Sequence, residues 1–255
     1  MTAGEVKTVL ITGTTSGVGE GLMQAYLARG DRVVAVNRRA PLRVPSEKLI
    51  DCRADVRNAD EIDGVFETLK GRGIRPDIYI LNAGIHRLDN SGSFDDRSFG
   101  EVLETNLMGV LRFVSRGMAL GPGRKKTFVA MSSTAVIFPN PTATGYYISK
   151  LGLNASFEIL RKRYQDEWND FKIVLLGPVR TRMLSSSPLA SRFQTFVRDS
   201  ISLSVSQAVP RLVRFIDGPK RILRYTLLSH GVFHAARIAT AIVPGIYKGS
   251  VPATR

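Results

Sequence analysis

A tyrosine and a lysine four positions apart have the clearest capacity for chemistry in this sequence. Tyr146 and Lys150 form Y-x-x-x-K in a stretch whose pattern predicts a helix, so both side chains project from one face, a turn apart. A free phenol has a pKa of about 10 and exchanges protons poorly near neutral pH. A neighbouring ammonium favours the phenolate and lowers that pKa, which makes Tyr146 a candidate general acid or base.

Other polar residues precede this pair, each at the end of an apolar run or on a long amphipathic stretch. Ser133 ends the run 127–133, thirteen residues before Tyr146, and Asn106 lies within 105–109, which reads T-N-L-M-G. Another apolar run closes with Asn82, Ala83 and Gly84. In sheets of parallel strands, ligands bind beyond the carboxyl ends of the strands. The chemistry is therefore expected at that edge.

The first apolar run leads into a glycine-rich turn, in which residues 12–19 read T-G-x-x-x-G-x-G. Glycines permit a tight turn and let the backbone approach a pyrophosphate. The helix that follows offers free N–H groups and the positive end of its dipole to the phosphates. The residues expected to line a dinucleotide here are Gly13, Thr15, Ser16, Gly17, Val18 and Gly19.

The end of the second apolar run bears on the choice between the two nicotinamide cofactors. A site for NAD usually has Asp or Glu about 20 residues after the glycines, where this chain has Asn37-Arg38-Arg39. Asn37 lacks the charge that repels a 2′-phosphate, and two guanidiniums can bind it. We therefore expect NADP(H); the alternative is a pair of solvated arginines. Asp55 and Val56, after the third run, are candidates to meet the adenine.

Short β-branched runs alternate with helical patterns along the chain, which predicts a single-domain α/β Rossmann fold with a doubly wound parallel sheet flanked by helices. The expected strands are 8–12, 32–36, 49–52, 78–81, 127–131 and 172–176, and the expected helices are 19–27, 59–70, 99–119 and 147–164. Within this one domain we assign 1–183 to the dinucleotide-binding and catalytic core, 184–218 to a substrate loop and following helix, and 219–255 to a basic helix and tail.

The length and composition fit an ordinary globular protein. The chain has 255 residues, of which 44% are hydrophobic, enough for one sizeable core. The first apolar run is too short for a secretory signal. A single cysteine, Cys52, rules out an internal disulfide and suits a reducing compartment. These features favour a cytoplasmic protein.

The motifs described above occur in an order that closely resembles the short-chain dehydrogenase/reductase family, over roughly residues 6–183. The resemblance implies that Tyr146 transfers a proton to or from the substrate oxygen while hydride moves to or from the nicotinamide. It implies that Ser133 holds that oxygen, that Lys150 lowers the pKa of Tyr146 and binds the ribose, and that Asn106 supports a water-linked proton relay. Asn82, Ala83 and Gly84 are implied to line the cofactor.

The chain departs from the family pattern at two positions. Residues 176–181 read L-G-P-V-R-T, with Leu176 where the family usually has proline. Val179 and Thr181 keep their spacing, so the contact with the nicotinamide is expected to survive. The residues of this segment expected to bind the cofactor are Gly177, Pro178, Val179 and Thr181. Val136 stands where the family commonly has glycine, which predicts a narrowed or redirected substrate pocket.

The last third of the chain is strongly basic. From Arg180 onward there are twelve Arg or Lys and two Asp, so this region carries +10 of the net +14. Residues 220–243 read as a long, mostly apolar helix interrupted by charges. It is a candidate for packing or dimerisation, for peripheral membrane contact, or for contact with an acidic carrier protein. His230 and His234 share a face, but without a third ligand we expect no metal site. Nothing in the pattern indicates nucleic-acid binding.

The expected function is a ketoreductase or alcohol dehydrogenase that uses NADP(H) on a small carbonyl or alcohol substrate, assembled as a homodimer or homotetramer. Apolar residues within 183–206 favour an apolar substrate. Two alternatives stay open, an epimerase or dehydratase on the same fold and a non-catalytic NADP(H)-binding regulator. The second alternative has no need of Ser133, Tyr146, Lys150 and Asn106 together.

Overall fold

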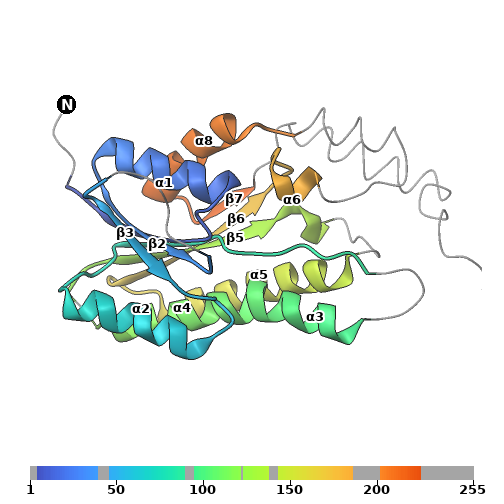
Figure 1. The fold of residues 1–255 in the computed structure, drawn as a ribbon, viewed down its shortest axis with the longest axis horizontal. Coiled ribbons are helices and arrows are strands. Elements are labelled where there is room, and N and C mark those ends of the chain that lie inside the picture. The colour runs from blue at the N-terminus through green and yellow to red at the C-terminus, as the bar shows by residue number, and fades with distance from the viewer. Residues whose placement is uncertain are drawn as a thin grey trace, which may run out of the picture.

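Parallel strands form a seven-stranded sheet in the order β3-β2-β1-β4-β5-β6-β7 (Figure 1). The computed structural model describes residues 5–39, 46–89, 95–121, 123–137, 143–185 and 202–224. The strands are β1 Thr8–Thr12, β2 Arg32–Asn37, β3 Leu49–Arg53, β4 Ile78–Leu81, β5 Lys126–Ser133, β6 Asn169–Leu176 and β7 Ile222–Arg224. The predicted fold class, a single-domain doubly wound α/β fold, is confirmed.

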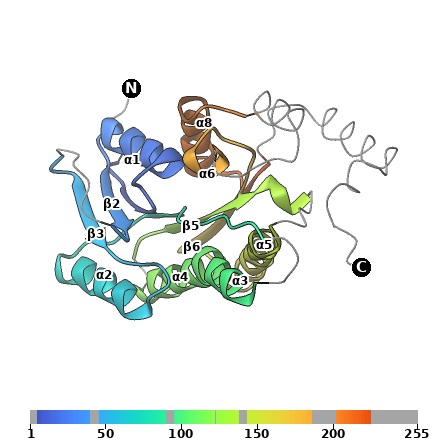
Figure 2. The same ribbon diagram turned by 45° about the vertical axis from the view of Figure 1, so that its right-hand side comes forward.

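Helices cover both faces of the sheet, which explains why the strands are apolar throughout rather than alternating. The α-helices are α1 Gly17–Arg29, α2 Ala59–Gly71, α3 Asp96–Leu103, α4 Gly109–Ala119, α5 Thr144–Tyr164, α6 Arg182–Ser185 and α8 Val205–Asp217. Figure 2 shows α1 and α8 on one face of the sheet, and α2, α4 and α5 on the other. In β1, Val9 and Ile11 belong to the core under α1 and α8, whereas Leu10 belongs to the opposite core.

The strand order reverses at β1, which pairs with β2 on one side and with β4 on the other. The connections that leave the carboxyl ends of β1 and β4 therefore diverge to opposite faces, and a crevice opens between them. The glycine turn follows β1 and is held against β2 by the Gly13 N–H, which donates to the Val36 carbonyl at 2.9 Å. The fold thus places the turn at the mouth of that crevice.

The helix predicted over 99–119 is present but is not regular. It consists of α3, a π-helical segment η1 Glu104–Met108, and α4. The irregular segment surrounds Asn106, whose side chain is fully buried. At the end of this segment, a Cβ on Gly109 would lie 2.7 Å from the Val56 carbonyl oxygen. Any residue other than glycine at position 109 would therefore clash with the backbone after β3. A π segment that interrupts an α-helix is frequent at functional sites.

The prediction of a helix beginning at residue 220 is wrong for its first residues. Ile222–Arg224 form strand β7, which extends the sheet beyond β6 in parallel register. Lys172 in β6 helps to place this edge, because its buried ammonium donates to the carbonyls of Ile216, at 2.8 Å, and Gly218 at the end of α8. The rest of the predicted helix, with His230 and His234, lies outside the described residues. Within the described ranges, no helix is long and apolar enough to cross a membrane.

Candidate active site

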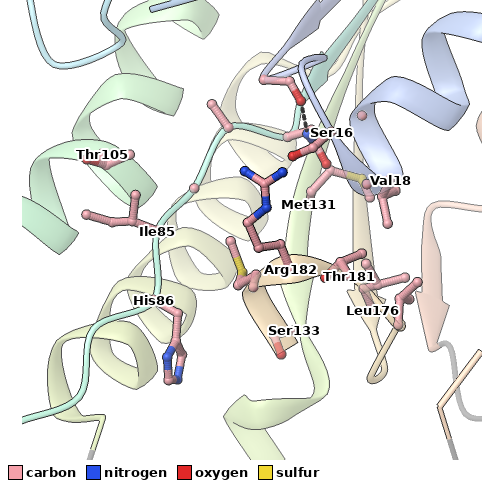
Figure 3. Close-up of a pocket in the computed structure, with 18 of the residues that line it drawn as sticks. Ser16, Val18, Ile85, His86, Thr105, Met131, Ser133, Leu176, Thr181 and Arg182 are labelled. Atoms are coloured by element: carbon pink, nitrogen blue, oxygen red, sulfur yellow. Dashed lines mark hydrogen bonds between the residues drawn. The ribbon is translucent and has the colours of Figure 1, made fainter. Parts of the chain in front are cut away.

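A cavity of about 760 Å³ opens at the carboxyl ends of the central strands (Figure 3). Every residue predicted to contact the cofactor lies on its wall: Gly13, Thr15, Ser16, Gly17, Val18, Gly19, Asn37, Arg38, Arg39, Asp55, Val56, Asn82, Ala83, Gly84, Tyr146, Lys150, Gly177, Pro178, Val179 and Thr181. Ser133 lies there too, whereas Asn106 does not. Seven segments that are far apart in the sequence therefore meet around one volume.

Close backbone approaches shape the glycine turn. Gly13 has φ +73°, and a Cβ there would lie 3.0 Å from the Cα of Ala83. Gly17 has φ +66°, and a Cβ there would lie 3.1 Å from the Cγ2 of Thr181. The Asn82 amide donates to the carbonyls of Thr12 and Gly13 at 3.1 and 2.9 Å, which ties the end of β4 to the turn.

The turn also meets the chemical requirements of a phosphate site. Ser16 stands at the N-cap of α1 with extended backbone, and its side chain caps none of the first N–H groups among the described residues. Those N–H groups and the positive end of the helix dipole lie at the cavity wall, an arrangement that binds anions. The residues present therefore fit the pyrophosphate of a dinucleotide.

Asn37 is buried and is bound to the glycine turn. Its side-chain oxygen accepts hydrogen bonds from the N–H of Thr14 at 2.8 Å and from the Thr14 hydroxyl at 3.2 Å. The residue borders the cavity, where it contributes no charge. Its role in the structure is to fix the turn, which the expectation from the sequence did not include.

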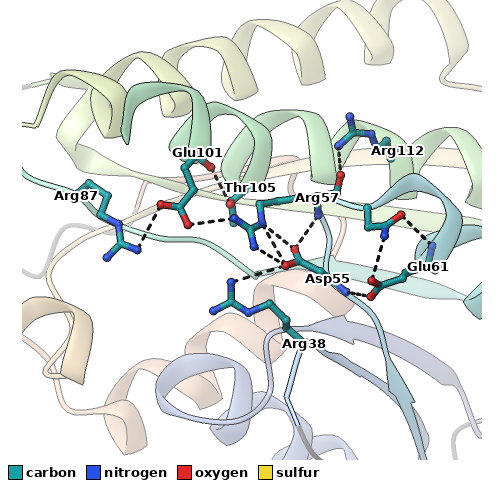
Figure 4. Close-up of polar contacts among 9 residues, drawn as sticks. Arg38, Asp55, Arg57, Glu61, Arg87, Glu101, Thr105 and Arg112 are labelled. Atoms are coloured by element: carbon teal, nitrogen blue, oxygen red, sulfur yellow. Dashed lines mark hydrogen bonds and ion pairs between the residues drawn. The ribbon is translucent and has the colours of Figure 1, made fainter. Parts of the chain in front are cut away.

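Arginines line the end of the cavity that follows β2 and β3 (Figure 4). A guanidinium nitrogen of Arg57 lies 2.7 Å from Asp55, and another lies 3.1 Å from Glu101, while Arg38 lies 3.7 Å from Asp55. The hydrogen bond from Arg57 holds the pKa of Asp55 below its usual range. Arg57 was not among the predicted site residues, although it directly follows Asp55-Val56. The structure thus adds a third arginine to Arg38 and Arg39.

Ser133, Tyr146 and Lys150 gather at the other end of the cavity. Ser133 and Tyr146 share a side-chain hydrogen bond that lowers the pKa of Tyr146, but burial has the larger effect and the net shift is upward. Lys150 is 6% exposed, and its ammonium donates to the Met131 carbonyl at 2.8 Å. Burial lowers the pKa of Lys150 to about 8. In this arrangement Tyr146 is a protonated phenol, contrary to the expected lowering of its pKa.

The Asn106 side chain holds the loop after β4 in place. Its oxygen accepts from the Ile85 N–H at 2.8 Å, and its amide donates to the Ile85 carbonyl at 2.9 Å and to the Ser149 hydroxyl at 3.1 Å. Both functional groups of the side chain are therefore used within the protein. A proton relay through this side chain stays a prediction.

His86 is a wall residue that the motifs did not predict. Its ring lies 4.8 Å from the Tyr146 ring in an edge-on arrangement. The loop that carries it is fixed on both sides, by Asn106 at Ile85 and by Asp89, which accepts the Thr144 N–H at the start of α5 at 3.0 Å. Burial lowers the pKa of His86, so the imidazole is neutral at pH 7. In the sequence, the indication that His86 lies near the cavity is its position two residues after N-A-G.

A parallel sheet, a glycine turn at the reversal of strand order and a cavity beyond the strand ends are the features of the doubly wound dinucleotide-binding fold. The family model described as short chain dehydrogenase matches residues 7–191. This chain belongs to that family of oxidoreductases.

Curated relatives include an uncharacterized oxidoreductase of Schizosaccharomyces pombe, 28% identical over 71% of this chain and 63% of its own length. Another is 11-beta-hydroxysteroid dehydrogenase A of Sesamum indicum, 30% identical over 68% of this chain and 51% of its own. The matched stretch thus spans less than two thirds of these two relatives. Oxidoreductase UcpA of Salmonella typhimurium is 26% identical over 80% of both chains.

Solved structures show the same fold. A short chain dehydrogenase from Burkholderia cenocepacia in complex with NADP has a TM-score of 0.77 at 20% identity, covering 96% of this chain and 98% of its own. One from Leptospira borgpetersenii with bound NAD⁺ has a TM-score of 0.72 at 23% identity, covering 84% and 86%.

Proposed function

We propose that this protein is an NADP(H)-dependent oxidoreductase that interconverts a carbonyl compound and an alcohol, with Tyr146 as the general acid or base. The observation that carries this proposal is the distribution of side chains in the cavity. Arg38, Arg39 and Arg57 lie at one end, and Ser133, Tyr146 and Lys150 lie at the other. When bound, the nicotinamide dinucleotide supplies or accepts the hydride.

Proton transfer to the substrate oxygen is the step that this chain's own residues perform. Tyr146 holds its proton, since burial raises its pKa, and a protonated phenol can donate to the oxygen of a carbonyl that is being reduced. In this proposal Ser133, which shares a hydrogen bond with Tyr146, donates to the same oxygen. Lys150 supplies the positive charge next to the phenol, with its ammonium 5.6 Å from the centre of the ring.

Replacing the phenol tests the assigned role. Tyr146→Phe should lower kcat for carbonyl reduction by about 10³-fold, because general acid catalysis contributes about 10²–10⁴-fold, while NADPH affinity stays within about threefold. Tyr147→Phe is the matched control, because Tyr147 is not on the cavity wall, and it should keep kcat. A screen of carbonyl compounds with NADPH, followed by absorbance, provides the substrate. Retained turnover in Tyr146→Phe would refute the role.

The preference for NADP(H) rests on charge. Among the described residues of the cavity wall, the cations are Arg38, Arg39, Arg57, Lys150 and Arg182, and the single carboxylate is Asp55. Asp55 is bound by Arg57 at 2.7 Å. The wall is therefore strongly positive, which suits a dinucleotide with an additional 2′-phosphate. Because solved relatives hold either NADP or NAD⁺, the preference depends on this chain's own arginines.

Direct titration separates the two cofactors. The wild-type protein should bind NADPH more tightly than NADH, and Arg38→Ala/Arg39→Ala should weaken NADPH binding by about tenfold, the size expected from losing charge-assisted contacts. NADH binding should change by less than about twofold. Arg53→Ala is the control, because Arg53 is exposed and lies off the wall. Equal affinities for both cofactors in all variants would exclude a 2′-phosphate site.

We also propose a cytoplasmic homodimer or homotetramer. Ile148, Leu151 and Ile159 form an apolar stripe on α5 and are 41%, 40% and 63% exposed. The spacing places them on one side of the helix, where a second copy can cover them. Light scattering after size exclusion should show a dimer or tetramer, and Ile148→Lys/Ile159→Lys should shift it toward the monomer.

The hypothesis of an apolar substrate rests on apolar residues within 183–206. Four of them lie outside the described residues: Leu189, Phe193, Phe196 and Val197.

A further inference from the structure

One cation of the cavity lies apart from both the adenosine end and the catalytic end. Figure 3 shows the Arg182 side chain extending from α6 into the middle of the cavity, with its guanidinium on the side where Ser16 lies. His86 and Ser133 lie at the other end of this view. Neither the glycine motif nor the catalytic motif includes Arg182.

The backbone that leads to Arg182 is held rigidly over the glycine turn. The Leu203 N–H donates to the Pro178 carbonyl at 3.1 Å, and the Arg180 N–H donates to the Leu203 carbonyl at 2.8 Å. Beyond this bridge, Thr181 is so close to Gly17 that a Cβ on the glycine would lie 3.1 Å from its methyl group. Arg182 is the next residue, so its Cα is held close to the start of α1.

The charge of Arg182 is available to a ligand. Within the described residues, no carboxylate lies within 4.0 Å of its guanidinium, whereas Arg38 and Arg57 are both paired with Asp55. A guanidinium binds phosphate oxygens through two parallel hydrogen bonds. The start of α1, which lies close to Thr181, offers N–H groups to the same anion.

We infer that Arg182 binds the pyrophosphate of the dinucleotide, beside the glycine turn. It would therefore set the affinity for the cofactor without affecting the choice between NADP(H) and NAD(H). This inference rests on the proposed function. The arginines at the adenosine end face the position of the 2′-phosphate, which the two cofactors do not share. Arg182 faces the group that they have in common.

Fragments of the cofactor test this division of roles by calorimetric titration. ADP-ribose contains the pyrophosphate without a 2′-phosphate, and adenosine 2′-monophosphate contains the 2′-phosphate without either phosphate of the pyrophosphate. Arg182→Ala should weaken NADPH, NADH and ADP-ribose by a similar factor of about ten, and should leave the affinity for adenosine 2′-monophosphate within about twofold. The affinities of Arg182→Lys for these three ligands should lie between those of the wild type and of Arg182→Ala, since lysine keeps the charge but loses the paired hydrogen bonds.

Arg180→Ala is the matched control, because it removes the same charge two residues away from an exposed side chain that lies off the wall. It should leave all four affinities unchanged. If Arg182→Ala weakens adenosine 2′-monophosphate as much as the dinucleotides, the inference is overturned while the proposed function stands. The same holds if its affinity for both dinucleotides is unchanged and the wild type binds them clearly. A wild-type protein that binds neither NADPH nor NADH would overturn the proposed function and the inference together. Thermal unfolding of each variant identifies any loss of the fold.

Discussion

Burial of the Lys150 ammonium couples the active site to stability. The pKa of this group is about 8 in the folded protein, against about 10.4 for an exposed lysine. Below pH 8 the lysine is charged in both the folded and the unfolded states, and the folded state bears the cost of burying the charge. Between pH 8 and about 10.4 the folded state releases the proton while the unfolded state keeps it, so this contribution to stability rises with pH.

Lys150→Met should therefore stabilise the protein at pH 7, by about 1–3 kcal/mol of unfolding free energy given the size of the shift, and the difference should narrow by pH 9.5. Urea unfolding at the two pH values measures it. Lys162→Met on the exposed face of the same helix should show neither effect. A variant less stable than the wild type at pH 7 would contradict the prediction.

The close approach of α4 to the strand ends is a feature at the scale of whole elements. A Cβ on Gly109 would meet the Val56 carbonyl at 2.7 Å, whereas a Cβ on Gly64, inside α2, would meet nothing within 4 Å. Gly109→Ala should lower the unfolding free energy by about 1–3 kcal/mol through overpacking. Gly64→Ala should raise it by about 0.5–1 kcal/mol through helix propensity. Thermal unfolding compares the two, and a neutral Gly109→Ala would show that α4 can shift freely.

The order of strands and helices was predictable because each strand or helix depends mainly on its local sequence. β1 and β4 have the predicted bounds, and α1 begins at Gly17, two residues before the predicted helix. The π segment, strand β7 and the use of Asn106 to bind Ile85 were not predictable. Each of them depends on partners distant in the sequence, such as the edge of β6.

The same reason separates the predicted wall residues from those missed. Gly13, Asn82 and Tyr146 belong to motifs whose spacing reflects the turn and the helix that carry them. Arg57, His86 and Arg182 lie one or two residues beyond such motifs. Only the folded chain shows that their side chains face the cavity.

At the scale of the whole molecule, positive charge should make cofactor binding depend on salt. The chain has a net charge of +14, and the described cavity wall has five cations against one carboxylate. Raising KCl from about 50 to about 300 mM should weaken NADPH binding about threefold more than NADH binding, because screening acts on the additional phosphate. Fluorescence titration measures both. Arg38→Ala/Arg39→Ala should reduce the NADPH dependence to that of NADH, and equal dependence in the wild type would contradict the prediction.

The hydrogen bonds between Asn37 and Thr14 have a consequence for how this site can change over generations. The oxygen of Asn37 accepts both the Thr14 N–H and the Thr14 hydroxyl, and the Asn37 amide lies 2.9 Å from the same hydroxyl oxygen. An aspartate has an oxygen at each of these two positions, so it loses the amide donor but can still accept both Thr14 groups. Codons for asparagine and aspartate differ by one base. Under the proposed preference for NADP(H), a lineage can therefore gain a carboxylate at this wall position, and with it a preference for NAD, in one mutational step that keeps acceptors for both Thr14 donors.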